Sequence, residues 1–373
     1  MISPTSVVEL LQALVRIPSV NPAGDPGTDG IGEQRIAEEL CSFLTTLGAE
    51  AGLREVQPGR PNVVARFPSD RPNKPRLLFA PHTDTVSVAG MTIDPFGGEL
   101  RDDRIWGRGS SDTKGPMASM LWALRESLDL IPTLSHEIWF AGLMSEETGQ
   151  YGAKALAAEE PFDFVIAGEP TGLDVVHTHK GALWLSLTAR GKAVHASAPE
   201  RGENAIYKMA DVLRCIRDEV APALGKVRHP VLGSPTISAG VVRGGSKTNI
   251  VPDFCEAHVD IRTIPGDETI LERVSAQLRA VCSDLEISSV CSQPMWTDPA
   301  HPLISLLGQC GAKSIGAPWF CDAAIFAQKG VAAIAMGPGS IAQAHTEDEW
   351  IAVSELQRGV DFFRRFLSGL KSG

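Results

Sequence analysis

The stretch RLLFAPHTDT, residues 76–85, sets a short apolar run directly before a histidine and an aspartate. A continuous apolar run such as Arg76–Ala80 is typical of a β-strand that is buried on both faces of a sheet. His82 and Asp84 therefore come just after the end of a predicted buried strand. In open α/β sheets ligands bind at this position, beyond the carboxyl ends of the strands.

The segments around this stretch alternate between helical and strand patterns. Apolar spacing predicts helices over residues 5–14, 33–47, 116–128 and 303–311. Short apolar runs predict further strands over residues 62–67, 136–144, 164–167 and 331–336. Such alternation is typical of a sheet that is covered by helices on both faces, so we expect a three-layer α/β/α domain.

The pattern changes after Lys180. Residues 182–190 alternate strictly between apolar and polar side chains, which indicates a half-exposed, antiparallel strand. The predicted elements that follow are a helix at 204–220, strands at 236–242 and 255–262, a helix at 268–282 and a strand at 285–290. This βαββαβ order is that of ferredoxin-like α+β modules. We therefore expect a catalytic α/β domain formed by residues 1–180 and 292–373, with an inserted domain at 181–291.

The charge and the cysteine pattern of the chain argue against several classes of function. Lys and Arg number 34 against 45 Asp and Glu, a net charge of −11, which argues against binding to nucleic acid or to anionic membranes. The seven cysteines form no CxxC pair, which argues against a disulfide framework and a thiolate zinc site. The first residues lack a basic region followed by an apolar core, so we expect no signal peptide and a cytoplasmic protein.

Further metal-type ligands follow the predicted strands. They are Glu146 and Glu147 in FAGLMSEETG, Glu169 in FVIAGEP, His345 in GPGSIAQAH, and Asp112 in the loop WGRGSSDTKGP. Each motif alone is common: a His-x-Asp arises by chance, an EE pair is usually a solvated turn, and an aspartate often caps a helix. Their joint occurrence at strand ends is not expected by chance. Imidazole and carboxylate groups suit zinc and related ions, and their number favours two ions that share a carboxylate.

Two pairs within this set suggest a division of roles. Adjacent side chains point in different directions, so one of Glu146 and Glu147 can bind metal while the other remains free as a general base. His82 and Asp84 are two residues apart and share a face in an extended segment. Asp84 is therefore placed to hold the imidazole ring of His82.

Several motifs in order resemble one known family, the dizinc metallopeptidases and deacylases that include acetylornithine deacetylase, succinyl-diaminopimelate desuccinylase and glutamate carboxypeptidase. The motifs are APHTDTV (80–86), WGRGSSDTKG (106–115), SEETG (145–149), GEPTG (168–172), HKG (179–181), HASAPERGENAI (195–206), TNIVP (248–252), DIRTIP (260–265) and GPGSIAQAHTEDE (337–349). The resemblance covers nearly the whole chain. GEPTG with HKG, and GPGSIAQAH, are most similar to the acetylornithine deacetylase branch.

The resemblance implies a centre with two Zn²⁺ ions, for which Co²⁺ or Mn²⁺ are candidate substitutes. By position, His82 and Glu169 are expected to bind one ion. Glu147 and His345 are expected to bind the other, and Asp112 is expected to bridge the two.

The resemblance also assigns roles outside the ligand set. Glu146 is expected to be the general base, and Asp84 the partner of His82. His195, in the inserted domain, is expected to reach the site of a partner subunit and to stabilise the oxyanion there. Asn249 and Arg262 match substrate-contacting positions, although Arg262 is equally well explained as a structural ion pair. The inserted domain is expected to serve as a lid and as the surface of a homodimer.

These inferences predict a zinc-dependent amidohydrolase. Its metal-activated water would remove the acyl group from an N-acyl amino acid, as in acetylornithine deacetylase or succinyl-diaminopimelate desuccinylase. The nearest alternative is a dizinc carboxypeptidase or dipeptidase acting on a short peptide through the same centre. An alternative from another class is a catalytically silent, dimeric binding protein.

Overall fold

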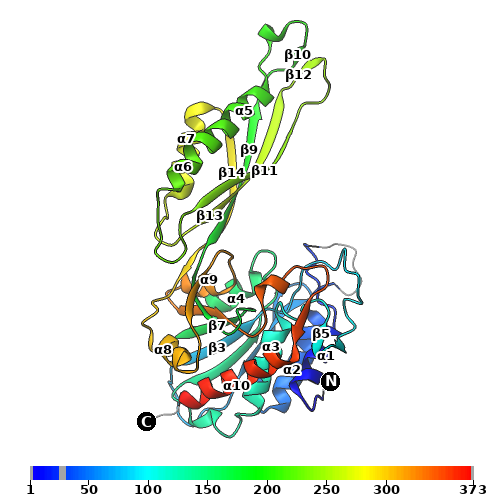
Figure 1. Cartoon of the computed structure of the whole chain (residues 1–373), viewed down its shortest axis with the longest axis vertical. Coiled ribbons are helices and arrows are strands. Elements are labelled where there is room, and N and C mark those ends of the chain that lie inside the picture. Colours follow the sequence, from blue (N-terminus) through cyan, green and yellow to red (C-terminus); the bar gives the residue numbers. More distant parts are fainter. Residues whose placement is uncertain (1–2, 25–30, 371–373) are drawn as a thin grey trace. The chain divides into compact units, whose positions relative to one another are not determined.

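The computed structural model describes residues 3–24 and 31–370, which fold into two compact units (Figure 1). Unit 1 consists of Met1–His177, Thr297–Ile315 and Cys321–Gly373. Unit 2 consists of Thr178–Trp296 and Gly316–Phe320. The predicted inserted segment, residues 181–291, falls within unit 2.

The core of unit 1 is built on a mixed sheet of nine strands, six of which lie wholly within that unit. Its order is β1-β2-β6-β3-β7-β17-β8-β15, with β16 paired to β8. The strands are β1 (Glu50–Gln57), β2 (Arg60–Arg66), β3 (Arg76–Pro81), β6 (Glu137–Gly142), β7 (Phe164–Gly168), β8 (Val175–His179), β15 (Met295–Trp296), β16 (Ser314–Ala317) and β17 (Ala332–Met336). The strands β6, β3, β7 and β17 run parallel to one another. Their carboxyl ends therefore share one edge of the sheet.

The parallel strands are the fully buried ones. Every residue of β6 and β7 is buried, and β3 is buried from Leu77 onward. Strands covered on both faces require continuous apolar runs, and this explains why RLLFA and FVIAG contain no alternating polar residues.

Helices cover both faces of this sheet. The helices of unit 1 are α1 (Val7–Val15), α2 (Gln34–Thr46), α3 (Lys114–Arg125), α4 (Tyr151–Glu159), α8 (Pro302–Gln309), α9 (Ala323–Ala327) and α10 (Val353–Gly369). The main core joins α1, α2, α3, α8 and α10 to one face of the sheet. Leu77 and Phe79 of β3 contribute to this core, and Phe79 meets Phe363 of α10 edge-on at 5.8 Å between ring centroids.

The opposite face carries α4 and α9, which contact each other. Trp139 of β6 lies between Ile138 and Phe140, whose side chains belong to the main core, so its own side chain points to the other face. There it contacts Phe162, which in turn contacts Phe326 of α9. The predicted three-layer α/β/α domain is confirmed.

Unit 2 is a four-stranded antiparallel sheet with helices against one face (Figure 1). The sheet order is β11-β13-β9-β14, formed by β9 (Gly181–Arg190), β11 (Thr236–Gly244), β13 (Phe254–Thr263) and β14 (Glu286–Ser292). The helices are α5 (Ala205–Cys215), α6 (Ala221–Leu224) and α7 (Ile270–Val281), and a π-helical turn joins α5 to α6 at Ile216–Val220. The chain order β9-α5-β11-β13-α7-β14 is the predicted βαββαβ arrangement.

Two small sheets complete the fold. In unit 2, β10 (Val194–His195) pairs with β12 (Ile250–Val251). In unit 1, β18 (Trp350–Ala352) pairs with β5 (Arg104–Trp106), which pairs with β4 (Glu99–Arg101). The second sheet lies beside the loop that contains Asp112, which begins just after β5. Among the described residues, each helix is too short or too polar to cross a bilayer.

Candidate metal centre

Four polar segments meet at the carboxyl edge of the parallel strands. His82 follows the last residue of β3, Glu146 and Glu147 lie four and five residues past β6, and Glu169 directly follows β7. His345 lies in the loop after β17, and its backbone has a positive φ of 60°. All four parent strands are parallel neighbours, so the fold itself brings these side chains together.

Asp112 lies between the two histidines. Its Oδ1 is 3.1 Å from Nε2 of His82, and its Oδ2 is 3.5 Å from Nε2 of His345. The aspartate is buried and lies just before α3, at the end of the loop that follows β5. One carboxylate therefore presents each of its oxygens to a different imidazole.

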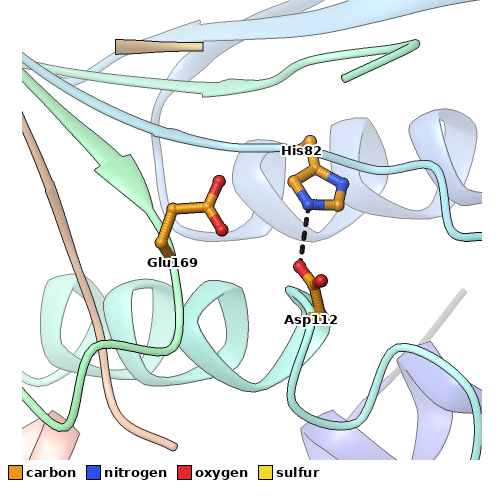
Figure 2. Close-up of side chains that lie close together, drawn as sticks. All are labelled: His82, Asp112 and Glu169. Atoms are coloured by element: carbon orange, nitrogen blue, oxygen red, sulfur yellow. Dashed lines mark hydrogen bonds and ion pairs between the residues drawn. The ribbon is translucent and has the colours of Figure 1, made fainter. Parts of the chain in front are cut away.

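The first group of candidate ligands is His82, Asp112 and Glu169, all of which are buried. Their ligand atoms lie within 4.8 Å of one another. In Figure 2 the three side chains come from separate segments and point toward one another. Residues of this type at this spacing are able to hold one divalent ion.

The second group is Asp112, Glu147 and His345, again with ligand atoms within 4.8 Å of one another. Oε2 of Glu147 is 3.1 Å from Nε2 of His345. Asp112 belongs to both groups, and the sharing of one carboxylate is what two neighbouring ions require. The ligand atoms of Glu146, His82 and Glu147 also lie within 4.8 Å of one another.

The predicted metal fits the donor atoms of this site. The set contains imidazole nitrogen and carboxylate oxygen, which are donors that Zn²⁺ accepts. Oε1 of Glu147 is buried and has no hydrogen-bond partner among the described residues. A buried oxygen of this kind is costly unless something pairs with it, and a cation would do so.

Asp84 links the histidine segment to the Glu146–Glu147 turn. Its carboxylate accepts hydrogen bonds from the backbone N–H groups of Glu146 at 2.9 Å and Glu147 at 3.1 Å, and from the side-chain amide of Asn21 at 2.8 Å. Nδ1 of His82 lies 2.9 Å from the backbone carbonyl oxygen of Asp84 and 3.4 Å from its Oδ1. The nearer partner of the ring is thus the carbonyl, and the carboxylate acts mainly on the turn.

Burial and mutual repulsion shift the pKa values of these carboxyl groups. Burial raises the pKa of Glu146 and of Glu169 well above the usual range, and the charge on His82 opposes that shift. Burial also raises the pKa of Glu147, while its hydrogen bond with His345 lowers it. Such crowding of acids is a common mark of a functional site.

His195 and Asn249 lie together in unit 2, on the β10–β12 pair. His195 pairs with Ile250, and the N–H of Ala196 donates to the backbone oxygen of Asn249 at 3.0 Å. The His195 ring is exposed. Its Nδ1 lies 3.1 Å from the backbone N of Ser197 and 2.7 Å from Ser197 Oγ, and the neutral tautomer that accepts the backbone N–H carries its proton on Nε2, from which it can donate.

Arg262 lies on β13 of the four-stranded sheet, which is separate from the β10–β12 pair. It pairs with Ala182 near the start of β9, whereas His195 follows the end of β9 at Arg190. The intervening strand separates the two positions by roughly 25 Å at 3.3 Å per residue. Arg262 donates to Oδ2 of Asp260 at 3.0 Å, so the structural ion pair that the sequence left open is present.

Three residues beside the centre had no predicted role. Asn21 binds Asp84, and Glu349 binds the backbone of the loop that contains Asp112. Asp322, at the start of α9, is buried, and burial raises its pKa to about 7. Glu349 lies within the GPGSIAQAHTEDE motif, so its segment carried a signal. Asn21 and Asp322 lie outside the quoted motifs, and only the folded chain reveals that they are buried near the centre.

The chain matches a known protein family over most of its length. Residues 78–369 match Peptidase family M20/M25/M40. The chain belongs to this family. Family membership identifies it as a metal-dependent hydrolase.

This chain is similar in sequence to one member of the family described below, and in fold to two others. Acetylornithine deacetylase of Proteus mirabilis is 31% identical to this chain, covering 94% of the chain and 93% of the relative. A tripeptidase of Staphylococcus aureus shares the fold with a TM-score of 0.81 at 22% identity, covering 100% of this chain and 99% of the other. A dinuclear metal binding peptidase of the M20 family from Bacillus subtilis does so with a TM-score of 0.72 at 13% identity, covering 98% of each chain.

Proposed function

We propose that this M20 hydrolase removes the acyl group from an N-acyl amino acid, using two Zn²⁺ ions. The observation that carries the proposal is the position of Asp112, whose two oxygens face His82 and His345. In this proposal His82 and Glu169 hold one ion, Glu147 and His345 hold the other, and Asp112 bridges them. The dinuclear metal binding peptidase of Bacillus subtilis has the same fold.

Bound ions of this kind polarise a carbonyl and lower the pKa of water. The chain's own residues then complete the chemistry. Glu146 is left free of the proposed ligand set and lies beside Glu147. Its carboxylate takes a proton from the attacking water and passes it to the departing amine, which is the role of a general base and then acid.

A backbone hydrogen bond fixes the position of Glu146. Its N–H donates to Asp84 at 2.9 Å, and the next N–H, that of Glu147, donates to the same carboxylate. The general base and a proposed ligand therefore share one anchor. A fixed turn keeps the base within reach of the reacting water, on which proton transfer depends.

His195 is the proposed donor to the oxyanion. In this proposal the backbone N–H of Ser197 donates to Nδ1, and the ring donates to the oxyanion from Nε2. We propose that it acts in the site of a second copy within a homodimer, and that Asn249, which directly precedes β12, contacts substrate. Arg262, already paired with Asp260, is proposed as a second substrate contact.

The substrate class rests on the relatives. The Proteus mirabilis relative at 31% identity is an acetylornithine deacetylase, and the GEPTG, HKG and GPGSIAQAH motifs favour the same branch. We therefore propose N-acetylornithine or a similar N-acyl amino acid as substrate. A cytoplasmic location, and domain boundaries at 181 and 291, belong to the same proposal.

A substrate panel tests this function. Zn²⁺- or Co²⁺-loaded protein is assayed with N-acetylornithine, N-succinyl-diaminopimelate, other N-acyl amino acids and dipeptides. Release of the free amino acid from an N-acyl substrate, at a higher kcat/KM than cleavage of any dipeptide, is the expected result. A preference for dipeptides would instead make the chain an exopeptidase, and no turnover together with no bound metal would make it a binding protein.

Replacement of Glu146 tests the proposed mechanism. Glu146→Gln is expected to retain two ions per chain and to lower kcat by about 100- to 10,000-fold, the usual contribution of a general base. Metal analysis and kinetics of the same sample give both values. Near wild-type turnover would show that another group takes the proton.

A further inference from the structure

Glu349 is a fully buried carboxylate that binds one short loop. Its Oε1 accepts hydrogen bonds from the backbone N–H groups of Ser111 at 2.7 Å and Asp112 at 2.8 Å. Its Oε2 accepts from the N–H of Gly109 at 2.8 Å and from Nη1 of Arg108 at 3.0 Å. Both oxygens are thus committed to residues 108–112, the loop that ends in Asp112.

Arg108 connects this loop to a second one. Its Nη2 donates to the backbone oxygen of Thr346 at 3.1 Å, and its Nε donates to that of Ser87 at 3.0 Å. Thr346 directly follows His345 in the chain. The Glu349–Arg108 pair therefore joins the backbone around Asp112 to the backbone around His345.

Burial of the charges makes displacement of this loop costly. Glu349 has 0% of its surface exposed and Arg108 has 3%, so both ions have lost their water. A buried ion is tolerated only when its remaining hydrogen-bonding capacity is satisfied. Glu349 meets this requirement with three backbone N–H groups and the guanidinium, and any displacement of the loop would leave a buried charge unpaired.

The preceding residue, Asp348, offers a natural contrast. Its carboxylate also accepts backbone hydrogen bonds, from Thr92 at 3.0 Å and Ile93 at 3.3 Å. Those two residues belong to a different loop, which contains none of the proposed ligands. Asp348 therefore anchors a loop in the same manner without acting on Asp112.

We propose that Glu349, through Arg108, is a positioning residue that sets the separation between Asp112 and His345. The inference rests on the proposed dinuclear site, in which these two residues are ligands. Glu349 does not touch the ions or the substrate in this scheme. It acts on metal binding through the backbone of Asp112, which is hydrogen-bonded directly to its Oε1.

Calorimetric titration of chelator-treated protein with Zn²⁺ tests this inference. Wild type is expected to bind two ions per chain. Glu349→Gln keeps the size of the side chain and places an amide N–H₂ against the loop N–H groups, so we expect metal affinity to fall about 10- to 100-fold, as for other residues that orient ligands. Asp348→Asn is the matched control and is expected to stay within about twofold of wild type.

Turnover as a function of metal concentration separates positioning from loss of structure. Activity lost in Glu349→Gln is expected to return as free Zn²⁺ is raised, which would not happen in a misfolded protein. Arg108→Lys keeps a cation beside Glu349 but cannot reach both Ser87 and Thr346, and we expect it to weaken metal binding as well. If Glu349→Gln does not fold, the metal affinity of Arg108→Lys tests the positioning role instead.

The outcomes are distinguishable. Wild-type metal affinity in a folded Glu349→Gln or Arg108→Lys variant would overturn the positioning role and leave the dinuclear proposal intact. Equal weakening by Asp348→Asn would also overturn it, because any loop anchor would then have the same effect. Failure of the wild type to bind two ions would reject the dinuclear proposal itself.

Discussion

Asp84 serves two parts of the centre with a single carboxylate. It receives the N–H groups of Glu146 and Glu147, and its backbone oxygen faces the ring of His82. The side-chain amide of Asn21 occupies a further position on the carboxylate. The proposed base, one proposed ligand and one imidazole are therefore fixed by the same residue.

Replacement of Asp84 should thus reduce turnover even when metal is saturating. In Asp84→Asn the side chain keeps its size, but its N–H₂ group faces a backbone N–H of the Glu146–Glu147 turn. We expect kcat to fall about 100-fold, since a displacement near 1 Å at a reacting group has this effect. Asn21→Ala removes only one of the donors and should cause a smaller loss. Unchanged kcat in Asp84→Asn at saturating Zn²⁺ would contradict the anchoring role.

His179, at the end of β8, gives a prediction for pH. It is fully buried, its Nδ1–H donates to the backbone oxygen of Lys180 at 2.9 Å, and burial lowers its pKa to about 4. The unfolded chain binds a proton near pH 6.5 and the folded chain does not, so stability falls as pH drops from about 6.5 to 4. The loss from this group is about 3 kcal/mol at 1.4 kcal/mol per pH unit.

The variant His179→Phe removes the titrating imidazole and should remove the part of the acid-induced loss of stability that this group causes. Urea unfolding of both proteins at pH 7.5 and pH 4.5 measures the difference. The stability that wild type loses between these two values should exceed the loss in the variant by about 2–3 kcal/mol. Equal losses would mean that His179 titrates normally in the folded chain.

The sequence predicted which residues would meet at the centre better than how they would interact. His82, Glu147, Glu169 and His345 follow parallel strands, and the parallel order of a buried sheet is enough to bring them to one edge. The contact between His82 and the carbonyl of Asp84 was not predictable, because it depends on how the backbone turns after the strand. The roles of Glu349 and Asn21 were missed because each acts through a residue far away in the chain.

At the scale of elements, α10 and β3 illustrate how the main core is held. Phe363 of α10 is fully buried and packs edge-on against Phe79 of β3. Removing a buried aromatic ring loses its burial and leaves a cavity, since packed cores relax only in part. The contact joins the last long helix to a central strand of the sheet.

Phe363→Ala is accordingly expected to lower the free energy of unfolding by about 3–5 kcal/mol. Phe254→Ala is the matched control, because Phe254 is 36% exposed on β13 of unit 2 and its loss leaves no closed cavity. Chemical denaturation of the two variants compares them. Similar losses in both would show that Phe363 is not part of a tightly packed core.

The elements that the sequence predicted are those with a strong periodic signal. β7 and β17 are apolar throughout, β3 is apolar from Leu77 onward, and the strands and helices of unit 2 follow the expected order. β1 was missed because none of its residues is buried and they show no alternation, and β4, β5 and β18 are only three residues long. α10 was not predicted, although Leu356, Val360, Phe363 and Leu367 recur at helical spacing and are all buried.

At the scale of the whole molecule, the proposed homodimer makes two inactive variants complementary. Glu146→Gln lacks the proposed base, and His195→Ala lacks the proposed oxyanion donor. If His195 acts in the partner's site, a mixed dimer contains one site with both residues intact. An equal mixture of the two variants should then recover about a quarter of wild-type activity, from the random pairing of identical subunits.

The measurement is turnover before and after the two variants exchange subunits, with each variant alone as the control. Recovery only after mixing supports a shared site. Persistent inactivity of a mixture shown to contain mixed dimers would place His195 in its own subunit's chemistry or outside catalysis. A monomeric protein would contradict the proposed assembly directly.

The position of β17 has a consequence for how the protein is made. This strand lies between β7 and β8 in the sheet, yet it comes after all of unit 2 in the chain. A nascent polypeptide that has reached Trp296 already contains the four strands of the unit 2 sheet, while β7 still has an unpaired edge that can pair with other chains. We therefore expect unit 2 to fold first on the ribosome. The sheet of the larger unit stays incomplete until Met336, the last residue of β17, has emerged. During that interval we expect this protein to depend most on chaperones.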